Sequence, residues 1–205
     1  MGRRSEHTPE GLKTLIVEAS EKIIGAHGLA GLSAREIARS VGYSPGTIYN
    51  IFENLDDLIL QVEARLLDDL DARLAMLSPD GPADMRVVRL ARAYLSFTAE
   101  RPRLWNVLFE HHLPSSIPVP VWYQHKLDAL MQRVEDVLRP MMPHAEQASI
   151  LRAARVLWAG VHGITSLAST DKLSNVTAET AQVLMDDLVQ NYLAGLQHRH
   201  AMQPC

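Results

Sequence analysis

Small and polar side chains gather on one face of a short predicted helix. That helix would begin at Pro45, and the face comprises Ser44, Gly46, Thr47 and Asn50. Hydroxyl and amide groups at such positions can hydrogen-bond to base edges or to the phosphates of DNA. The small residues would let the helix approach the bases closely. A buried helix of an ordinary bundle does not need such a face, so the segment predicts a helix that reads DNA.

The preceding segment has the start and stop signals of a second short helix. Ser33 is followed three residues later by Glu36, the pattern of a capping box. Gly42 permits the positive φ of a sharp turn, and Ala38 lets the two helices cross closely. The pair predicts a helix-turn-helix, whose second helix enters the major groove while the first braces it. The side chains expected to face inward from the helix that begins at Pro45 are Ile48, Tyr49 and Phe52.

Helical spacing dominates the rest of the chain. Thr8-Pro9 and Gly28 bracket a first helix, and Asn54 caps a long fourth one. Further helices are expected at about 83–99, 102–112, 120–139, 145–169 and 177–198, separated by Pro- or Ser-rich stretches. The sequence therefore predicts an all-α protein. Its parts are an N-terminal three-helix helix-turn-helix domain over residues 1–54 and a C-terminal antiparallel helical bundle over residues 55–205.

Composition restricts the possible function classes. The 205 residues have a net charge of −4, and the first 55 residues contain six basic and six acidic side chains. Contact with DNA must therefore be local rather than spread over a basic surface. The single cysteine, Cys205, allows no intrachain disulfide, and the polar N-terminus shows no secretory signal. No apolar run approaches the roughly 20 residues of a membrane helix. We expect a cytoplasmic protein with no membrane partner.

The segment Leu32–Phe52 resembles the DNA-binding segment of the tetracycline-repressor (TetR) family of transcriptional regulators. The resemblance lies in Ile37-Ala38, the turn Gly42, Gly46-Thr47-Ile48-Tyr49 and the closing Phe52 at fixed offsets. It implies that Thr47 and Tyr49 touch DNA, Tyr49 through a phosphate, and that Arg35 reaches a base edge, expected to be guanine. The expected DNA-binding residues are Ser33, Arg35, Ser44, Pro45, Gly46, Thr47, Tyr49 and Asn50.

Two positions depart from the family pattern. Ile51 stands where the family often has His or Tyr, and Leu55 stands where it often has Lys. Both family residues are usual phosphate contacts. Arg3 and Arg4 would compensate if they form a basic arm on the DNA backbone, and the alternative is a solvated terminus.

The C-terminal half resembles the family's sensor-domain type marked by a Trp-x-x-x-His-Gly motif, here Trp158–Gly163, together with the segment Tyr94–Phe109. The resemblance implies the architecture and leaves the ligand open. Trp158 and His162 are one helical turn apart and share a face, so they either pack in the core or line a pocket. Gly160 and Gly163 would let another helix approach closely. The expected ligand-binding residues are Trp105, Phe109, Trp122, Trp158 and His162.

Histidines raise metal binding and catalysis as alternatives. The pairs His111-His112 and His198-His200 have spacings that point side chains apart on a helix, and no third ligand stands at metal spacing. We expect no metal and no cofactor. An enzyme that uses His111, His112 or His162 with an acid is one rival, and it would need a convergent acid–base pair. A helical interaction module without DNA binding is the other.

The sequence thus predicts a non-enzymatic, ligand-responsive transcriptional repressor. Two recognition helices of a homodimer would occupy successive major grooves of a pseudo-palindromic DNA operator. A neutral, apolar or aromatic small-molecule effector would release it by favouring another state, transmitted through the helix from Asn54 to Leu77. Dimerisation is expected through the helices at 145–169 and 177–198, because a single bundle would not bury the apolar stripes of both helices. These stripes comprise Ile150, Leu151, Ala154, Leu157, Val161, Leu184, Leu188, Tyr192 and Leu196.

Overall fold

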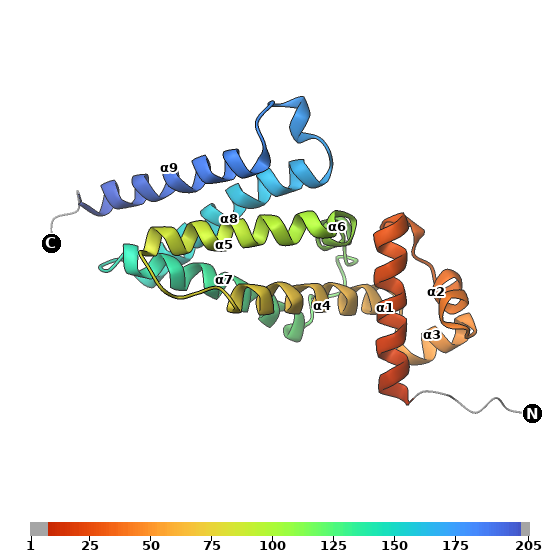
Figure 1. Ribbon diagram of the computed structural model, residues 1–205. Coiled ribbons are helices and arrows are strands. Elements are labelled where there is room, and N and C mark those ends of the chain that lie inside the picture. The colour runs from red at the N-terminus through yellow and green to blue at the C-terminus, as the bar shows by residue number, and fades with distance from the viewer. Residues whose placement is uncertain (1–7, 202–205) are drawn as a thin grey trace, which may run out of the picture. The chain divides into compact units, whose positions relative to one another are not determined.

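The computed structural model describes residues 8–201, and every regular element in that range is a helix (Figure 1). The α-helices are α1 Pro9–His27, α2 Ala34–Val41, α3 Pro45–Ile51, α4 Leu55–Ala75, α5 Ala83–Glu100, α6 Pro102–Glu110, α7 Val121–Leu138, α8 Gln147–Ser169 and α9 Ala181–Ala201. Single 3-10 turns, η1 Leu29–Gly31, η2 Arg139–Met141 and η3 Leu173–Asn175, follow α1, α7 and α8. The all-α prediction is confirmed.

The start of α9 differs most from the expected helix ends. The helix expected from 177 begins at Ala181 because hydroxyl groups cap the preceding turn. The Thr177 hydroxyl accepts a hydrogen bond from the Glu179 amide at 3.1 Å, and the Thr180 hydroxyl accepts one from the Val183 amide at 3.3 Å. Threonine hydroxyls that bond to nearby amides compete with helix formation and define its first residue.

Contacts divide the chain into two compact units. Unit 1 contains the chain up to Leu66 together with residues 101–123, and unit 2 contains residues 67–100 and the chain from Gln124 onward. The first half of α4, all of α6 and the start of α7 therefore belong with the helix-turn-helix. The domain boundary between residues 54 and 55 stays a prediction.

In unit 1, α1 packs against α2, α3 and α6 (Figure 1). The Thr8 hydroxyl accepts a hydrogen bond from the Gly11 amide at 3.1 Å, Pro9 occupies the first turn, and the Gly28 amide closes the helix on Ile24. These are the start and stop signals that the sequence predicts. The apolar face of α1 is buried, including Leu12, Ile16 and Ile24.

The α2–α3 turn is a tight left-handed one. The Ser33 hydroxyl caps α2 by accepting from the Glu36 amide at 3.2 Å. Gly42 ends α2 with φ 75° and ψ 26°, and the Tyr43 amide bonds back to the Ala38 carbonyl at 2.9 Å. This is the helix-ending geometry that glycine adopts most readily. The turn confirms the predicted helix-turn-helix.

Two expectations for α3 are corrected. Ile48 and Phe52 are buried as predicted, but Tyr49 is 52% exposed rather than inward, because it follows Ile48 by one position and points about 100° away around the helix. Ser44 stands at the capping position, but its hydroxyl pairs with the Thr47 hydroxyl at 3.0 Å and does not cap a backbone amide.

Unit 2 is built on α5, α8 and α9, which pack against one another. Arg92 on α5 forms a two-pronged ion pair with Asp186 on α9, with distances of 3.0 and 2.8 Å. A Cβ added at Gly160 would lie 2.8 Å from Leu188, so the glycine lets α9 approach α8 within the same chain. At Gly163 an added Cβ meets nothing within 4 Å.

Most of the α8 stripe expected at a dimer interface is buried within the chain. Ile150, Ala154, Leu157 and Val161 are at most 5% exposed, and Leu196 of α9 is also buried. The α8 stripe is therefore largely covered within one chain by α5 and α9, contrary to expectation. In the α9 stripe, Leu184, Leu188 and Tyr192 are half-buried, and dimerisation through these helices stays a prediction. The large apolar residues that remain exposed in these helices are Val156, Leu167 and Val183.

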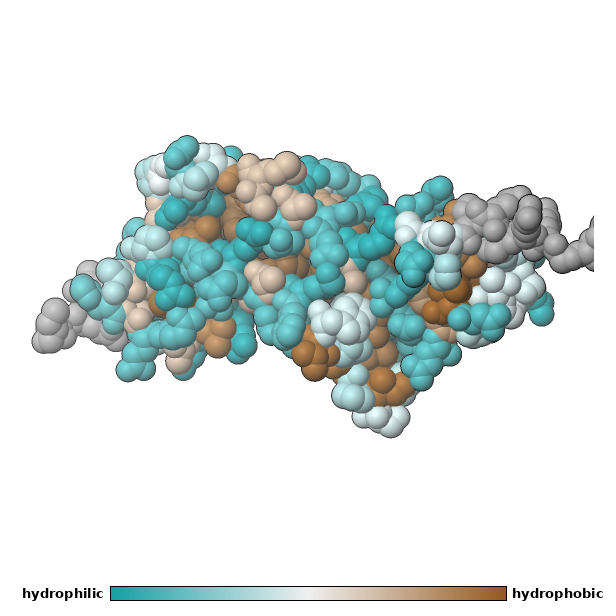
Figure 2. Space-filling view, turned by 90° about the horizontal axis from the view of Figure 1, so that it is seen from below, coloured by the Kyte–Doolittle hydropathy of each residue, from teal (hydrophilic) through white to brown (hydrophobic). Residues whose placement is uncertain are grey.

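Hydrophobic residues on the surface are scattered rather than gathered in one large patch on the face drawn in Figure 2. On the face drawn in Figure 2 the surface is mostly hydrophilic, with hydrophobic residues in separate small patches. Among the described residues, no helix combines the length and the apolar character needed to cross a membrane.

Gly42 provides a test of the turn. Replacing Gly42 by Ala should lower the free energy of unfolding by about 1–2 kcal/mol, because a left-handed residue with a Cβ is strained. Gly25→Ala is the matched control: an added Cβ meets nothing within 4 Å at either position, but Gly25 lies inside α1. That change should stabilise by roughly 0.5–1 kcal/mol. Urea unfolding of both variants measures the difference, and equal effects would contradict the assigned turn geometry.

Candidate nucleic-acid interface

The exposed face of α3 carries most of the predicted DNA-binding residues. Ser44, Pro45, Gly46, Tyr49 and Asn50 are exposed, and Thr47 is half-buried. Ile48, on the opposite side, is only 1% exposed and anchors the helix to its unit. The structure therefore brings these residues together on one short helix whose orientation is fixed by burial.

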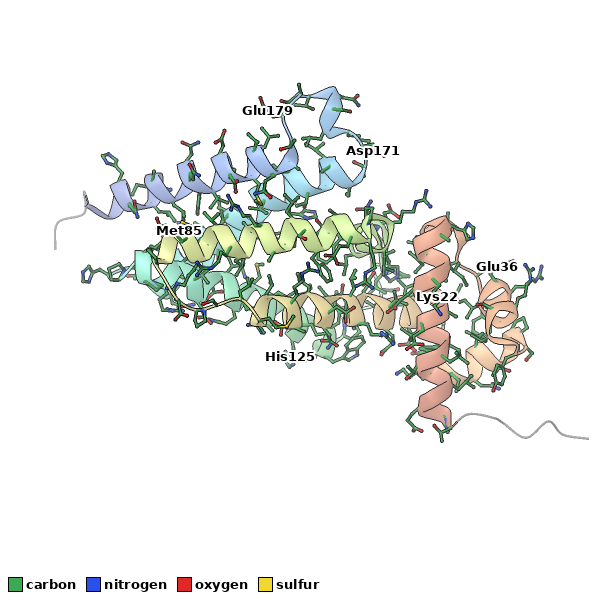
Figure 3. The ribbon with its side chains drawn as sticks, viewed as in Figure 1. Lys22, Glu36, Met85, His125, Asp171 and Glu179 are labelled. Atoms are coloured by element: carbon green, nitrogen blue, oxygen red, sulfur yellow. The ribbon has the colours of Figure 1, made fainter. Side chains whose placement is uncertain are left out.

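Arg35 presents a cation at the start of α2. It is exposed and has no ion-pair partner among the described residues. Arg39, on the same helix, instead pairs with Glu36 at 2.9 Å; Glu36 is labelled in Figure 3. Ser33 is half-buried with its hydroxyl engaged in the cap, which is its role in this structure. An arginine without a competing carboxylate can donate two hydrogen bonds to one base or phosphate.

The departures at Ile51 and Leu55 have a structural use, because both side chains are half-buried. Lys13 of α1, which sequence analysis did not single out, lies near the end of α3. Its ammonium group is 5.7 Å from the centroid of the Phe52 ring, within the range of a cation–π contact. No motif marks this lysine, since the contact joins residues far apart in the sequence. Arg3 and Arg4 lie outside the described residues.

Trp158 and His162 form one stacked pair on α8 in unit 2. Their ring centroids are 5.1 Å apart and their planes are inclined by 6°. His162 Nδ1 lies 2.9 Å from the Tyr94 hydroxyl of α5. Burial lowers the pKa of His162, which favours the neutral imidazole, and a neutral ring can accept a hydrogen bond from that hydroxyl. Trp158 is half-buried, so part of its surface remains accessible.

The other aromatic residues of the predicted pocket belong to unit 1. Trp105 is 4% exposed and lies 6.1 Å, centroid to centroid, from the 41%-exposed Phe109. Trp122 is 39% exposed and meets Tyr123 edge-on at 5.8 Å. Trp105 is therefore a core residue of unit 1. The five predicted ligand-binding residues divide into one pair in unit 2 and three residues in unit 1.

A surface cavity of about 540 Å³ lies elsewhere in unit 2, at the beginning of α8 and the end of α9. Its wall combines apolar side chains with two arginines, and Trp158 and His162 do not line it. The lining includes Met142, Arg152, Val156, Tyr192, Leu196 and Arg199.

In the described part of the chain, no group of three or more His, Cys, Asp or Glu side chains has an arrangement that could hold a metal ion, and the histidine pairs form no such group. His111 Nδ1 lies 2.9 Å from Glu63, whereas His112 Nδ1 lies 2.9 Å from the backbone carbonyl of Glu110. His198 is exposed, and the side chain of His200 lies outside the described residues. An acid–base pair of the kind an enzyme needs therefore exists, but its His111 and Glu63 side chains are only 6% and 4% exposed. Such burial closes the pair to a substrate.

Two family models match the chain. The model for bacterial regulatory proteins of the tetR family matches residues 16–62, which contain the helix-turn-helix. The model for the tetracyclin repressor-like C-terminal domain matches residues 87–192. An uncharacterized HTH-type transcriptional regulator of Mycobacterium tuberculosis is 24% identical over 184 residues, covering 90% of this chain and 81% of the relative.

Solved structures show the same fold. A tetR-family transcriptional regulator from Streptomyces coelicolor superimposes with a TM-score of 0.69 at 17% identity, covering 100% of this chain and 92% of the other. The transcriptional regulator FadR from Bacillus subtilis, solved with stearoyl-CoA, gives a TM-score of 0.64 at 16% identity, covering 89% and 98%. With the family models spanning both the helix-turn-helix and most of the following helices, the chain belongs to the TetR family of DNA-binding transcriptional regulators.

Proposed function

We propose that this regulator is a homodimeric repressor that binds a pseudo-palindromic operator through α3 and leaves it when a small-molecule effector binds. The observation that supports operator recognition is the exposed polar face of α3, held in place by the buried Ile48 and Phe52, beside the exposed Arg35. A rigid helix with small residues at its start fits the major groove.

Each residue of this face has a distinct part in the proposal. Thr47 and Asn50 hydrogen-bond to base edges or phosphates, and the exposed Tyr49 hydroxyl binds a phosphate. Arg35 donates to a base edge, expected to be guanine. Pro45 and Gly46 keep the helix start narrow, and Ser44 holds the Thr47 hydroxyl through their 3.0 Å contact.

The effector in this proposal is a neutral, apolar or aromatic small molecule that contacts the Trp158–His162 pair. The accessible part of the Trp158 ring and the neutral imidazole beneath it supply an apolar surface with one polar group. FadR, a structural neighbour at 16% identity, was solved with stearoyl-CoA. The acyl chain of that molecule is apolar but its CoA part carries phosphates, so it supports only the apolar character of the proposed effector. The molecule would release DNA only by binding more tightly to a state with lower operator affinity.

Arg35 tests operator recognition. After selection of a duplex from random DNA, Arg35→Ala should weaken binding to it by about 1–3 kcal/mol and relax the preference at one base pair per half-site. Arg35→Lys should lose the same preference, because lysine keeps the charge but not the two-pronged geometry. Fluorescence anisotropy on matched and mismatched duplexes measures both effects.

Equal loss on every duplex together with rescue by lysine would show that Arg35 contacts phosphate only. Failure of the wild-type protein to select any duplex would reject the proposed operator binding.

The dimer is tested on the exposed stripe of α8. Val156, Ala159, Gly163 and Leu167 recur at helical spacing and are all exposed, and burying them would offset the cost of association. Val156→Glu should therefore shift the protein from dimer to monomer in light scattering at micromolar concentration. Val176→Glu is the control, since Val176 is more exposed, at 73% against 53%, and lies off the stripe. A monomeric wild-type protein, or equal effects of the two changes, would argue against this interface.

Trp158 separates a ligand contact from a purely structural role. In an operator-release assay that identifies an effector, Trp158→Ala should abolish release while leaving the operator affinity of the free protein nearly unchanged. Trp122→Ala, which changes an exposed tryptophan outside unit 2, serves as the control and should leave the response less affected. If Trp158 has only a structural role, Trp158→Ala should instead lower the free energy of unfolding by up to about 3–5 kcal/mol. The melting temperature and the operator affinity would then fall together. A stable Trp158→Ala protein that still responds to the effector would contradict the proposed contact.

A further inference from the structure

A buried ionic cluster joins α6 and α7 to the first half of α4 within unit 1. Its centre is His111, the residue that directly follows α6, whose side chain is 6% exposed. His111 Nδ1 lies 2.9 Å from Glu63 Oε1, and His111 Nε2 lies 3.2 Å from Asp56 Oδ1. Glu63 is 4% exposed in its side chain, and Asp56 is 36% exposed. Both carboxylates are on α4, two turns apart.

The geometry of the cluster favours the protonated form of the His111 ring. Each ring nitrogen faces an oxygen of a carboxylate, and an ionised carboxylate can only accept hydrogen bonds. A neutral imidazole has a single N–H, so one nitrogen lone pair would oppose a carboxylate oxygen. The imidazolium donates to both. It also neutralises Glu63, which would otherwise be a buried anion with a high desolvation cost.

The surroundings of His111 reinforce this state. The Glu63 hydrogen bond, followed by the charges of Glu63 and Asp56, raises the pKa of His111 against the opposing effect of burial. On α7, burial and the nearby Glu63 carboxylate raise the pKa of the Tyr123 phenol, which keeps this hydroxyl protonated. His112, the neighbouring titratable group, is engaged with the backbone carbonyl of Glu110.

We propose that His111 is a proton-dependent tie that fastens the end of α6 to α4, and that operator binding weakens when the tie loses its proton. The helix-turn-helix leads directly into this part of α4. The Asn54 side chain caps α4 by accepting a hydrogen bond from the Asp57 amide at 2.9 Å, and Phe52, two residues before Asn54, is buried. Asp56 lies in the first turn of α4, so the tie reaches the residues that directly follow the recognition helix. Loss of the proton removes the positive charge and one of the two N–H donors, which loosens the contact between α4 and the end of α6 and leaves the recognition helix less well positioned for DNA.

The direction of the pH dependence follows from the raised pKa. In the unfolded chain His111 titrates near its ordinary value of about 6.5. The stabilisation from the tie is fully present below that pH and is lost as the pH rises through the higher folded-state value. This device rests on the operator binding proposed above, but the state of His111 can be measured without DNA.

The experiment follows the His111 ring in the full-length protein by NMR from pH 5.5 to 9, with the signal assigned by its absence in His111→Gln. The wild-type midpoint should lie above 6.5. Glu63→Gln should lower that midpoint, since it removes the charge while keeping a similar shape. Asp56→Asn, at a more exposed site, should lower it less and serves if Glu63→Gln does not fold. His112→Gln is the matched control and should leave the midpoint unchanged.

Operator affinity and melting temperature are then measured over the same pH range at constant ionic strength. Wild-type and His112→Gln proteins should lose affinity by about 5-fold or more across the His111 midpoint, a usual size for coupling between sites. His111→Gln should bind with the weaker affinity throughout. The melting temperature of the wild-type protein should exceed that of His111→Gln most at low pH.

A His111 midpoint at or below 6.5 would overturn the tie, as would identical pH profiles for wild-type and His111→Gln proteins. If no duplex is bound at any pH, the operator proposal fails, and the NMR and melting data decide the tie on their own.

Discussion

The recognition helix depends on burial of Ile48 and Phe52. α3 has only 7 residues, and isolated helices shorter than about 12–15 residues are marginal in water. Its conformation and direction therefore come from packing on the neighbouring helices rather than from its own hydrogen bonds. This constraint explains why the two sides of the helix differ in burial and polarity. Ile48 on one side is almost completely buried, and the opposite side can remain small and polar without loss of order.

The same constraint makes α4 more than a connector. Phe52 ends the buried contact of α3, and the Asn54 cap starts α4 only two residues later. Little slack remains between the two helices, so a displacement at the start of α4 must be passed to α3 or absorbed by this short junction. The first half of α4 also supplies Arg65, which forms ion pairs with Glu18 and Glu21 of α1 at 3.5 and 3.0 Å. The ion pairs thus fasten α4, which directly follows the recognition helix, to α1.

Local signals in the sequence were sufficient for the helices and for the face of α3. Ser33, Gly42 and Asn54 act through atoms three to five residues away, so each could be interpreted without knowledge of the tertiary structure. The same local pattern failed for Tyr49, because an aromatic residue next to a buried Ile48 was assumed to share its side of the helix. Along α8, periodicity identified the buried stripe but not its partner, which turned out to be within the same chain.

The cluster at His111 lay beyond such signals. Glu63 and His111 are 48 residues apart, and neither an adjacent histidine pair nor an isolated glutamate indicates the contact. One clue was present: Glu63 lies four residues from both Ile59 and Leu67, which are buried apolar residues of α4. A carboxylate at such a position must find a cation or a proton when the helix is buried. The sequence could thus predict that Glu63 has a partner, but only the fold identifies it.

The charge balance of the N-terminal segment makes positioning unusually important for this regulator. With six basic and six acidic residues among the first 55, and with Arg39 engaged by Glu36, few cations are available to hold the phosphate backbone. Each phosphate contact contributes to affinity through counterion release, so a protein with few of them has a smaller nonspecific contribution. In the proposed operator complex, more of the affinity would then come from directional hydrogen bonds made by the α3 face and Arg35. Such bonds weaken steeply with misalignment, which is why small changes at the base of α3 can serve to control DNA binding.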